Sequence, residues 1–136
     1  MKKIFIAIVI VLVASIGFAD EQLATQKKAV FKSLEKLQVS TDLSTGKYKV
    51  LLADAKTEFN IYSRMEDTEK SGYSCVWALD NCISNYRQME LVLELIDASY
   101  GNASNFLAEA LRDKSELLKK GQNELDKAYK DCFPSK

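Results

Sequence analysis

The sequence predicts an all-α protein, folded as an antiparallel (up-down) helical bundle of about four helices. Apolar residues recur at steps of three, four and seven, which places them on one stripe of a helix. The segments between loop formers are rich in good helix formers such as Ala, Leu, Glu, Lys and Gln. The chain has only five glycines and one proline, the strongest breakers of regular structure. No segment alternates with period two for long enough to predict a strand.

The N-terminus has the pattern of a signal peptide over residues 1–19. Lys2 and Lys3 precede an apolar run over residues 4–18, and small residues at Gly17 and Ala19 suit a signal peptidase. A membrane-spanning helix needs about 20 apolar residues, so this run is short for a permanent anchor. We therefore expect cleavage after Ala19 and a periplasmic or secreted protein. The alternative is an uncleaved signal-anchor that tethers the rest of the chain outside the membrane.

Residues 20–136 then form a single helical domain, a length that suits one hydrophobic core. Removal of the two N-terminal lysines leaves a net charge of about −2. This near-neutral balance gives no electrostatic attraction for nucleic acid or for an anionic membrane surface, so neither is an expected partner.

The first two helices are expected at 21–39 and 46–70. Their boundary lies in a cluster of loop formers, Ser40-Thr41-Asp42 and Ser44-Thr45-Gly46. The apolar stripe of the first helix comprises Leu23, Val30, Leu34 and Leu37, and that of the second comprises Leu52, Ala55, Phe59 and Tyr62.

The third and fourth helices are expected at 74–99 and 104–131, separated by Gly101-Asn102-Ala103 and followed by Pro134. Their stripes comprise Leu79, Cys82, Tyr86, Met89, Leu93 and Ile96, then Leu107, Ala110, Leu111, Leu118, Leu125 and Tyr129. A single glycine costs a helix only about 1 kcal/mol. The alternative is therefore that helices two and three continue through Gly72, which would give an extended helical hairpin instead of a bundle.

The three cysteines are interpreted as structural, because an exported protein reaches an oxidising compartment. On one helix, Cys75 and Cys82 lie roughly 10 Å apart, beyond the reach of a disulfide. In the hairpin of the last two helices, Cys132 falls opposite the start of the third helix, within one turn of Cys75. We therefore predict a Cys75–Cys132 disulfide and an unpaired Cys82. If residues 71–75 are loop, a Cys82–Cys132 pair becomes the alternative.

An unpaired Cys82 has two interpretations. Free cysteine packs well as a small apolar core residue. An odd cysteine in an exported protein also invites an intermolecular bridge.

No catalytic, metal or cofactor site is predicted. The chain has no histidine, which excludes Ser-His-Asp and Cys-His catalysis and the histidine-containing zinc and di-iron motifs. Three scattered cysteines do not make a zinc site. We expect a protein that is not an enzyme.

Two features indicate a protein-binding surface. Leu91, Val92, Leu93, Leu95 and Ile96 cover more than one side of their helix, as in a central helix or one that meets a partner. Three aromatic residues near predicted helix ends, Tyr73, Trp77 and Tyr100, are of the types enriched at interfaces. Each set is also explained by a small core.

The C-terminal segment is similar to the helical tail of secreted lysozyme inhibitors of the LprI type. The likeness rests on Gln122, the Tyr129-Lys130 pair and Cys132. The register differs by one residue, Leu125 stands at the family's tryptophan position, and the earlier cysteine spacing does not fit. The resemblance covers a short part of the chain and implies an inhibitor-type role.

The leading functional hypothesis is an exported, non-enzymatic helical bundle that binds another envelope or secreted protein, in an inhibitor- or immunity-type role. A homodimer is a further expectation. The alternatives are a membrane-tethered coiled-coil structural protein and a periplasmic chaperone.

Overall fold

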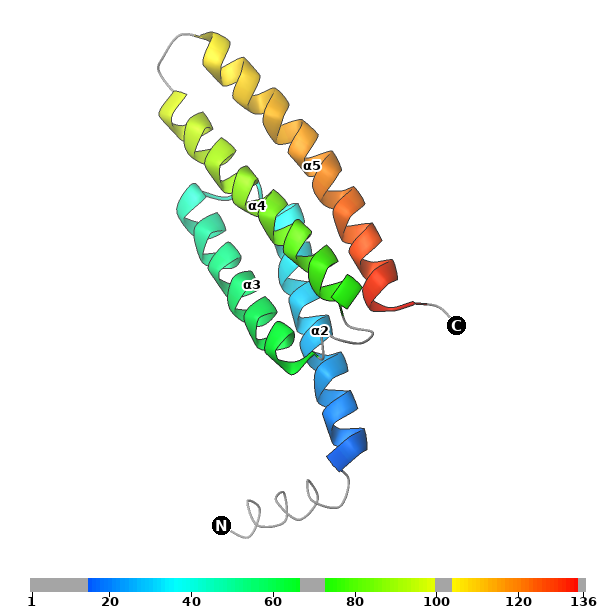
Figure 1. The fold of residues 1–136 in the computed structure, drawn as a ribbon. Helices are drawn as coiled ribbons and strands as arrows, with labels where there is room; N and C mark the ends of the chain where they lie inside the picture. The colour runs from blue at the N-terminus through cyan, green and yellow to red at the C-terminus, as the bar shows by residue number, and fades with distance from the viewer. Residues whose placement is uncertain (1–14, 67–72, 100–103, 135–136) are drawn as a thin grey trace, which may run out of the picture.

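The structure is a computed structural model that describes residues 15–66, 73–99 and 104–134, with side chains from residues 21 and 106 in the first and last of these ranges. Within them lie four helices: α2 (Ser15–Val39), α3 (Thr45–Met65), α4 (Tyr73–Ser99) and α5 (Ser104–Cys132) (Figure 1). The predicted all-α bundle is confirmed.

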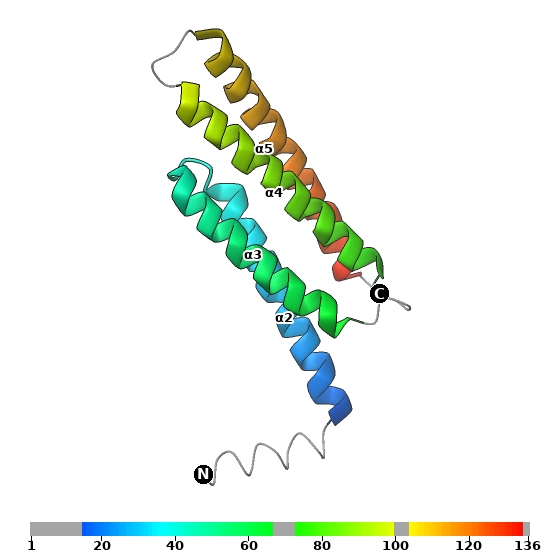
Figure 2. The same ribbon diagram turned by 60° about the vertical axis from the view of Figure 1, so that its left-hand side comes forward.

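The bundle consists of two antiparallel hairpins laid side by side. Helices α2 and α3 form one hairpin, and α4 and α5 form the other (Figures 1 and 2). The hairpins meet mainly through α3 and α4, and less closely through α2 and α5, so that α2 lies diagonally opposite α4. The alternative of one long hairpin is wrong, because α3 and α4 are separate helices that pack against each other.

Two helix ends differ from the expected bounds. The expected start at 21 followed from the expected cleavage after Ala19, whereas helix α2 of the full chain begins at Ser15 and continues through the isolated Gly17. Helix α3 ends at Met65 instead of 70, because Glu66 has an extended backbone with φ −83° and ψ 141°. At its start, the Ser44 hydroxyl accepts a hydrogen bond from the Lys47 amide, and this N-cap sets the first turn at Thr45. The proposed break at Gly72 lies outside the described residues.

The core follows the predicted stripes closely. All four helices contribute buried side chains, among them Val30, Leu34, Leu37, Tyr48, Leu52, Tyr62, Leu79, Cys82, Tyr86, Met89, Leu93, Ile96, Ala110 and Leu125. Two expected stripe residues are instead about half exposed, Leu111 and Tyr129. Helix α5 is flanked by α4 and, less closely, by α2, so a narrower stripe of α5 is covered.

Three helices meet at the backbone of α5 around Gly121, in what we call the Gly121 contact. The Tyr86 hydroxyl of α4 donates to Gln38 Oε1 of α2 at 2.9 Å, and Gln38 Nε2 donates to the Leu118 carbonyl at 2.7 Å. Asn85 Nδ2 donates to the Leu117 carbonyl at 3.2 Å. A Cβ at Gly121 would lie 2.6 Å from Gln38 Oε1 and 2.9 Å from Asn85 Nδ2. Glycine at 121 therefore allows these hydrogen bonds to form.

At the opposite end of the hairpin from the α4–α5 connection, a disulfide joins Cys75 to Cys132, with the two Cα atoms 4.6 Å apart. This is the pairing expected from the helical geometry. Lys27 of α2 donates to the Cys132 carbonyl at 2.8 Å, which connects the other hairpin to the same place. The disulfide and this hydrogen bond together fix the C-terminal end of α5.

We expect opposite effects from alanine at two helical glycines. Gly121→Ala should lower the free energy of unfolding by about 1–3 kcal/mol, because the new Cβ overpacks Gln38 and Asn85. Gly46→Ala should raise the free energy of unfolding by up to about 1 kcal/mol, because alanine has a higher helix propensity than glycine. The added Cβ is tolerated, since no atom lies within 4 Å of it. Urea unfolding followed by circular dichroism measures both. A stabilised Gly121→Ala would contradict the Gly121 contact.

Reduction of the disulfide should destabilise the fold strongly. Its sequence separation of 57 residues corresponds to about 4 kcal/mol in the chain-entropy model. Urea unfolding of the oxidised protein and of a Cys75→Ser/Cys132→Ser variant should differ by about 2–4 kcal/mol. Reductant should leave the variant unchanged, and equal stabilities of the two proteins would refute the staple role.

Candidate protein-binding surface

The buried titratable groups of the core are held in their neutral forms. Burial raises the pKa of the phenols Tyr48, Tyr62 and Tyr86, and nearby carboxylates raise it further. Burial, helped by the charge of Glu124, also raises the pKa of the Cys82 thiol to about 12. A protonated thiol or phenol is a poor nucleophile or base, so these groups are not activated for chemistry.

Cys82 is the free cysteine of the described chain and is fully buried. Its burial favours the interpretation as a small apolar core residue. An intermolecular bridge through Cys82 would require α4 to be pulled out of the core.

The residues predicted as an interface fall into two groups. Val92, Leu93 and Ile96 are buried in the core. Leu91 and Leu95 are more than half exposed, and so are Tyr73 and Trp77 at the other end of α4. Tyr100 lies outside the described residues. The structure therefore separates a core set from an exposed set, a distinction that the apolar pattern alone did not make.

The exposed set lies in one row along α4. Tyr73 and Leu91 are separated by about five helical turns, as are Trp77 and Leu95, so all four side chains leave the same side of the helix over roughly 33 Å. Between them this side carries small and charged residues. We call it the outer face of α4, and it comprises Tyr73, Trp77, Asp80, Ser84, Arg87, Leu91 and Leu95. The four large apolar side chains are 52–63% exposed.

Helix α5 borders this face. A cavity of about 410 Å³ lies between Gln88, Leu91 and Val92 of α4 and four residues of α5, which are Asp113, Glu116, Leu117 and Lys120. Nearer the disulfide, Lys127 Nζ lies 5.8 Å from the centre of the Trp77 ring. Apolar side chains rimmed by charges are typical of protein contact surfaces.

A second open region, which we call the α2–α5 groove, lies between α2 and α5. These two helices are the most loosely packed pair of neighbours in the bundle. Phe31, Tyr129 and Phe133 form an aromatic cluster there, with ring centres 5.0–5.5 Å apart. Two cavities of about 250 and 290 Å³ share Phe31, Glu35 and Tyr129. Sequence reasoning missed this groove. The repeat of aromatic residues four apart at Tyr129 and Phe133 was the available signal.

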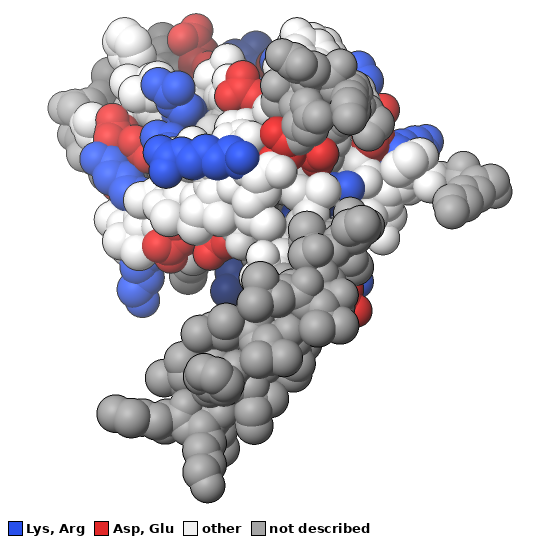
Figure 3. Space-filling view, turned by 60° about the horizontal axis from the view of Figure 1, so that its bottom comes forward, with Lys and Arg blue, Asp and Glu red and all other residues white. Residues whose placement is uncertain are grey.

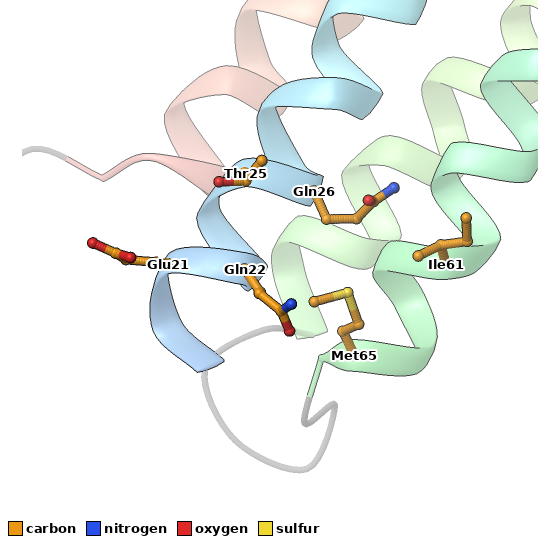
Figure 4. Close-up of a pocket in the computed structure, with 6 residues that line it drawn as sticks. All are labelled: Glu21, Gln22, Thr25, Gln26, Ile61 and Met65. Atoms are coloured by element: carbon orange, nitrogen blue, oxygen red, sulfur yellow. The ribbon is translucent and has the colours of Figure 1, made fainter. Parts of the chain in front are cut away.

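A third cavity, of about 480 Å³, lies between the start of α2 and the end of α3. Figure 4 shows Gln22 and Met65 pointing towards each other across the opening, while Glu21 points away. Gln26 Nε2 donates to the Glu58 carbonyl at 2.9 Å and to its carboxylate at 2.7 Å. Amides, a hydroxyl, a thioether and one carboxylate line this cavity, a set that offers contacts but no acid–base pair.

The surface at this end carries both signs of charge. In Figure 3, viewed towards the end where α2 begins, an uncharged area is bordered by blue Lys and Arg and by red Asp and Glu side chains. Such an interspersed distribution provides no single-sign field to attract a polyanion.

Two properties of the described residues bear on function. They contain no cluster of three or more cysteine or acidic side chains that could hold a metal ion. None of their helices combines the length and the apolarity needed to cross a membrane.

Native Cys82 should not react with a thiol reagent. Because its pKa is raised to about 12, the thiol is almost fully protonated at pH 8, and burial blocks access. Ellman's reagent should report no accessible thiol in the folded, oxidised protein and one in urea. Rapid modification of the folded protein would show that Cys82 is exposed.

Comparison of the chain with protein-family models, with curated proteins and with solved structures finds no match. The likeness of the C-terminal segment to lysozyme inhibitors therefore rests only on its few matching residues.

Proposed function

We propose that the chain is an exported, non-enzymatic helical-bundle protein that binds another protein through the outer face of α4. The single observation that carries this proposal is the row of four exposed apolar side chains on one side of a helix whose other side forms the core. Leaving tryptophan, tyrosine and leucine side chains in water forgoes the free energy of burying them, and protein association recovers that free energy.

The chemistry of the chain favours binding over catalysis. The sequence has no histidine to act as a general base near neutral pH. The buried phenols and the Cys82 thiol are kept protonated by their surroundings. The cavities are shallow regions between helices whose polar lining is made of amides and scattered charges. A contact surface uses such groups, whereas an active site needs a tuned acid, base or nucleophile.

The signal peptide expected at residues 1–19 guides the choice of partner. A disulfide-stapled bundle in an oxidising compartment meets other envelope or secreted proteins, and an inhibitor- or immunity-type role follows from occupying one of them. An uncleaved N-terminal run would instead tether the same surface to the membrane, which is the second candidate function.

The proposal predicts site-specific photocrosslinking in the producing cell. A photoreactive phenylalanine analogue at Leu91 should form a covalent adduct with the partner, because that side chain is 59% exposed on the outer face of α4. The same analogue at Ala53, an exposed residue of α3, is the matched control and should give no adduct of that mass.

Mass spectrometry of the Leu91 adduct identifies the partner. An adduct formed equally at both positions would reflect random collision and would refute the proposed surface. The absence of any adduct at Leu91 would do the same.

A further inference from the structure

The outer face of α4 is self-complementary under a two-fold rotation. Ser84 lies midway between Tyr73 and Leu95, and also midway between Trp77 and Leu91. If a second α4 packs antiparallel with the axis at Ser84, Tyr73 of one copy lies opposite Leu95 of the other, and Trp77 lies opposite Leu91. Each contact then occurs twice, as a two-fold symmetric interface requires.

The charges on this face obey the same symmetry. Asp80 precedes Ser84 by about one helical turn and Arg87 follows it by about one turn, on the same flank of the helix. In the antiparallel pair, Asp80 of one copy lies almost level with Arg87 of the other. Their positions along the helix axes differ by only about 1.5 Å, the rise of one residue. Both residues are exposed, and neither has an ion-pair partner among the described residues.

The opposite flank is matched in polarity. Asn81 and Gln88 occupy it, and the rotation brings Asn81 of one copy level with Gln88 of the other within the same helical turn. Amide side chains both donate and accept hydrogen bonds, so the pair is complementary in either orientation. At the axis, the small side chain of Ser84 lets the two helix backbones approach.

We propose that the outer face of α4 binds a second copy of this chain, in an antiparallel homodimer whose two-fold axis passes at Ser84. This inference rests on the proposed function, because it takes the outer face of α4 as the protein-binding surface. It names a second copy of this chain, in place of a different envelope protein, as the protein bound there. The dimer leaves the α2–α5 groove free in each copy, because α2 lies diagonally opposite α4.

Charge reversal tests the dimer directly, by sedimentation velocity of the purified, oxidised protein over a concentration series. The unmodified protein should pass from the mass of one chain to that of two. Asp80→Arg alone and Arg87→Asp alone should each raise the dissociation constant of the dimer by at least about tenfold. In either variant, positions 80 and 87 of opposite chains carry the same charge, and this repulsive pair occurs twice in the dimer.

An equimolar mixture of the two single variants should recover the dimer. In the mixed pair, the arginine introduced at position 80 of one chain faces the aspartate introduced at position 87 of the other. The unchanged Asp80 and Arg87 form the second contact, so both pairs again have opposite charges, and the dissociation constant should return to within about threefold of the original. Asp54→Arg, the same change at an exposed residue of α3, is the control and should have no effect. Recovery in the mixture also shows that both variants are folded.

A protein that stays monomeric at every concentration would overturn the dimer, and so would a mixture that stays dissociated. Crosslinking at Leu91 separates this failure from that of the proposed function. An adduct with twice the mass of the chain supports the dimer. An adduct with a different protein overturns the dimer and leaves the binding function standing, whereas no adduct overturns both.

Discussion

The arrangement of the bundle depends on the Gly121 contact, where side chains from α2 and α4 reach the backbone of α5. A helix that is polar over most of its circumference offers little apolar area for packing, and α5 is such a helix. Gln38 donates a hydrogen bond to the Leu118 carbonyl, and Asn85 donates one to the Leu117 carbonyl. These bonds fix the position of α5 along its axis and its rotation relative to the other helices. Hydrogen bonds require specific geometry, whereas apolar contacts tolerate sliding, so these partly buried bonds define the register of α5.

The core around the Gly121 contact also contains polar groups without partners. The Tyr48 hydroxyl and Asn85 Oδ1 are buried and accept or donate no hydrogen bond among the described residues. Unsatisfied buried groups cost stability, typically about 1–3 kcal/mol each. The disulfide at the far end of α4 offsets part of this cost by restricting the unfolded chain. Two unpartnered polar atoms in an otherwise apolar core therefore occur together with a covalent staple.

Much of the fold follows from the sequence because helical periodicity is a local property. The stripes over Val30–Leu37 and Leu79–Ile96 are read directly from spacing, and the bridge between Cys75 and Cys132 follows from the rise per residue of two antiparallel helices. The end of α3 at Met65 was not predictable, since Glu66 is a good helix former that adopts an extended backbone here. The half-exposed Tyr129 was misplaced because the loose packing of α2 on α5 is a property of the assembled bundle.

The candidate surface, like the fold, was predictable from the sequence only in part. The sequence identified an excess of apolar residues between Leu91 and Ile96, but it did not show which of them α4 turns to the solvent. The packing of α3 and α5 on α4 decides this, since these two helices cover the side that carries Val92, Leu93 and Ile96. Once that side is assigned, the symmetry of the remaining residues about Ser84 can be recognised.

The bond between Cys75 and Cys132 closes the α4–α5 hairpin into a covalent ring. Any single cut of the backbone inside this ring leaves both pieces attached, and the new ends stay near each other within a folded bundle. If a protease cuts the chain between α4 and α5, the disulfide therefore keeps α5 attached to the rest of the protein. The hairpin α2–α3 has no such closure among the described residues, so its integrity depends on an unbroken chain.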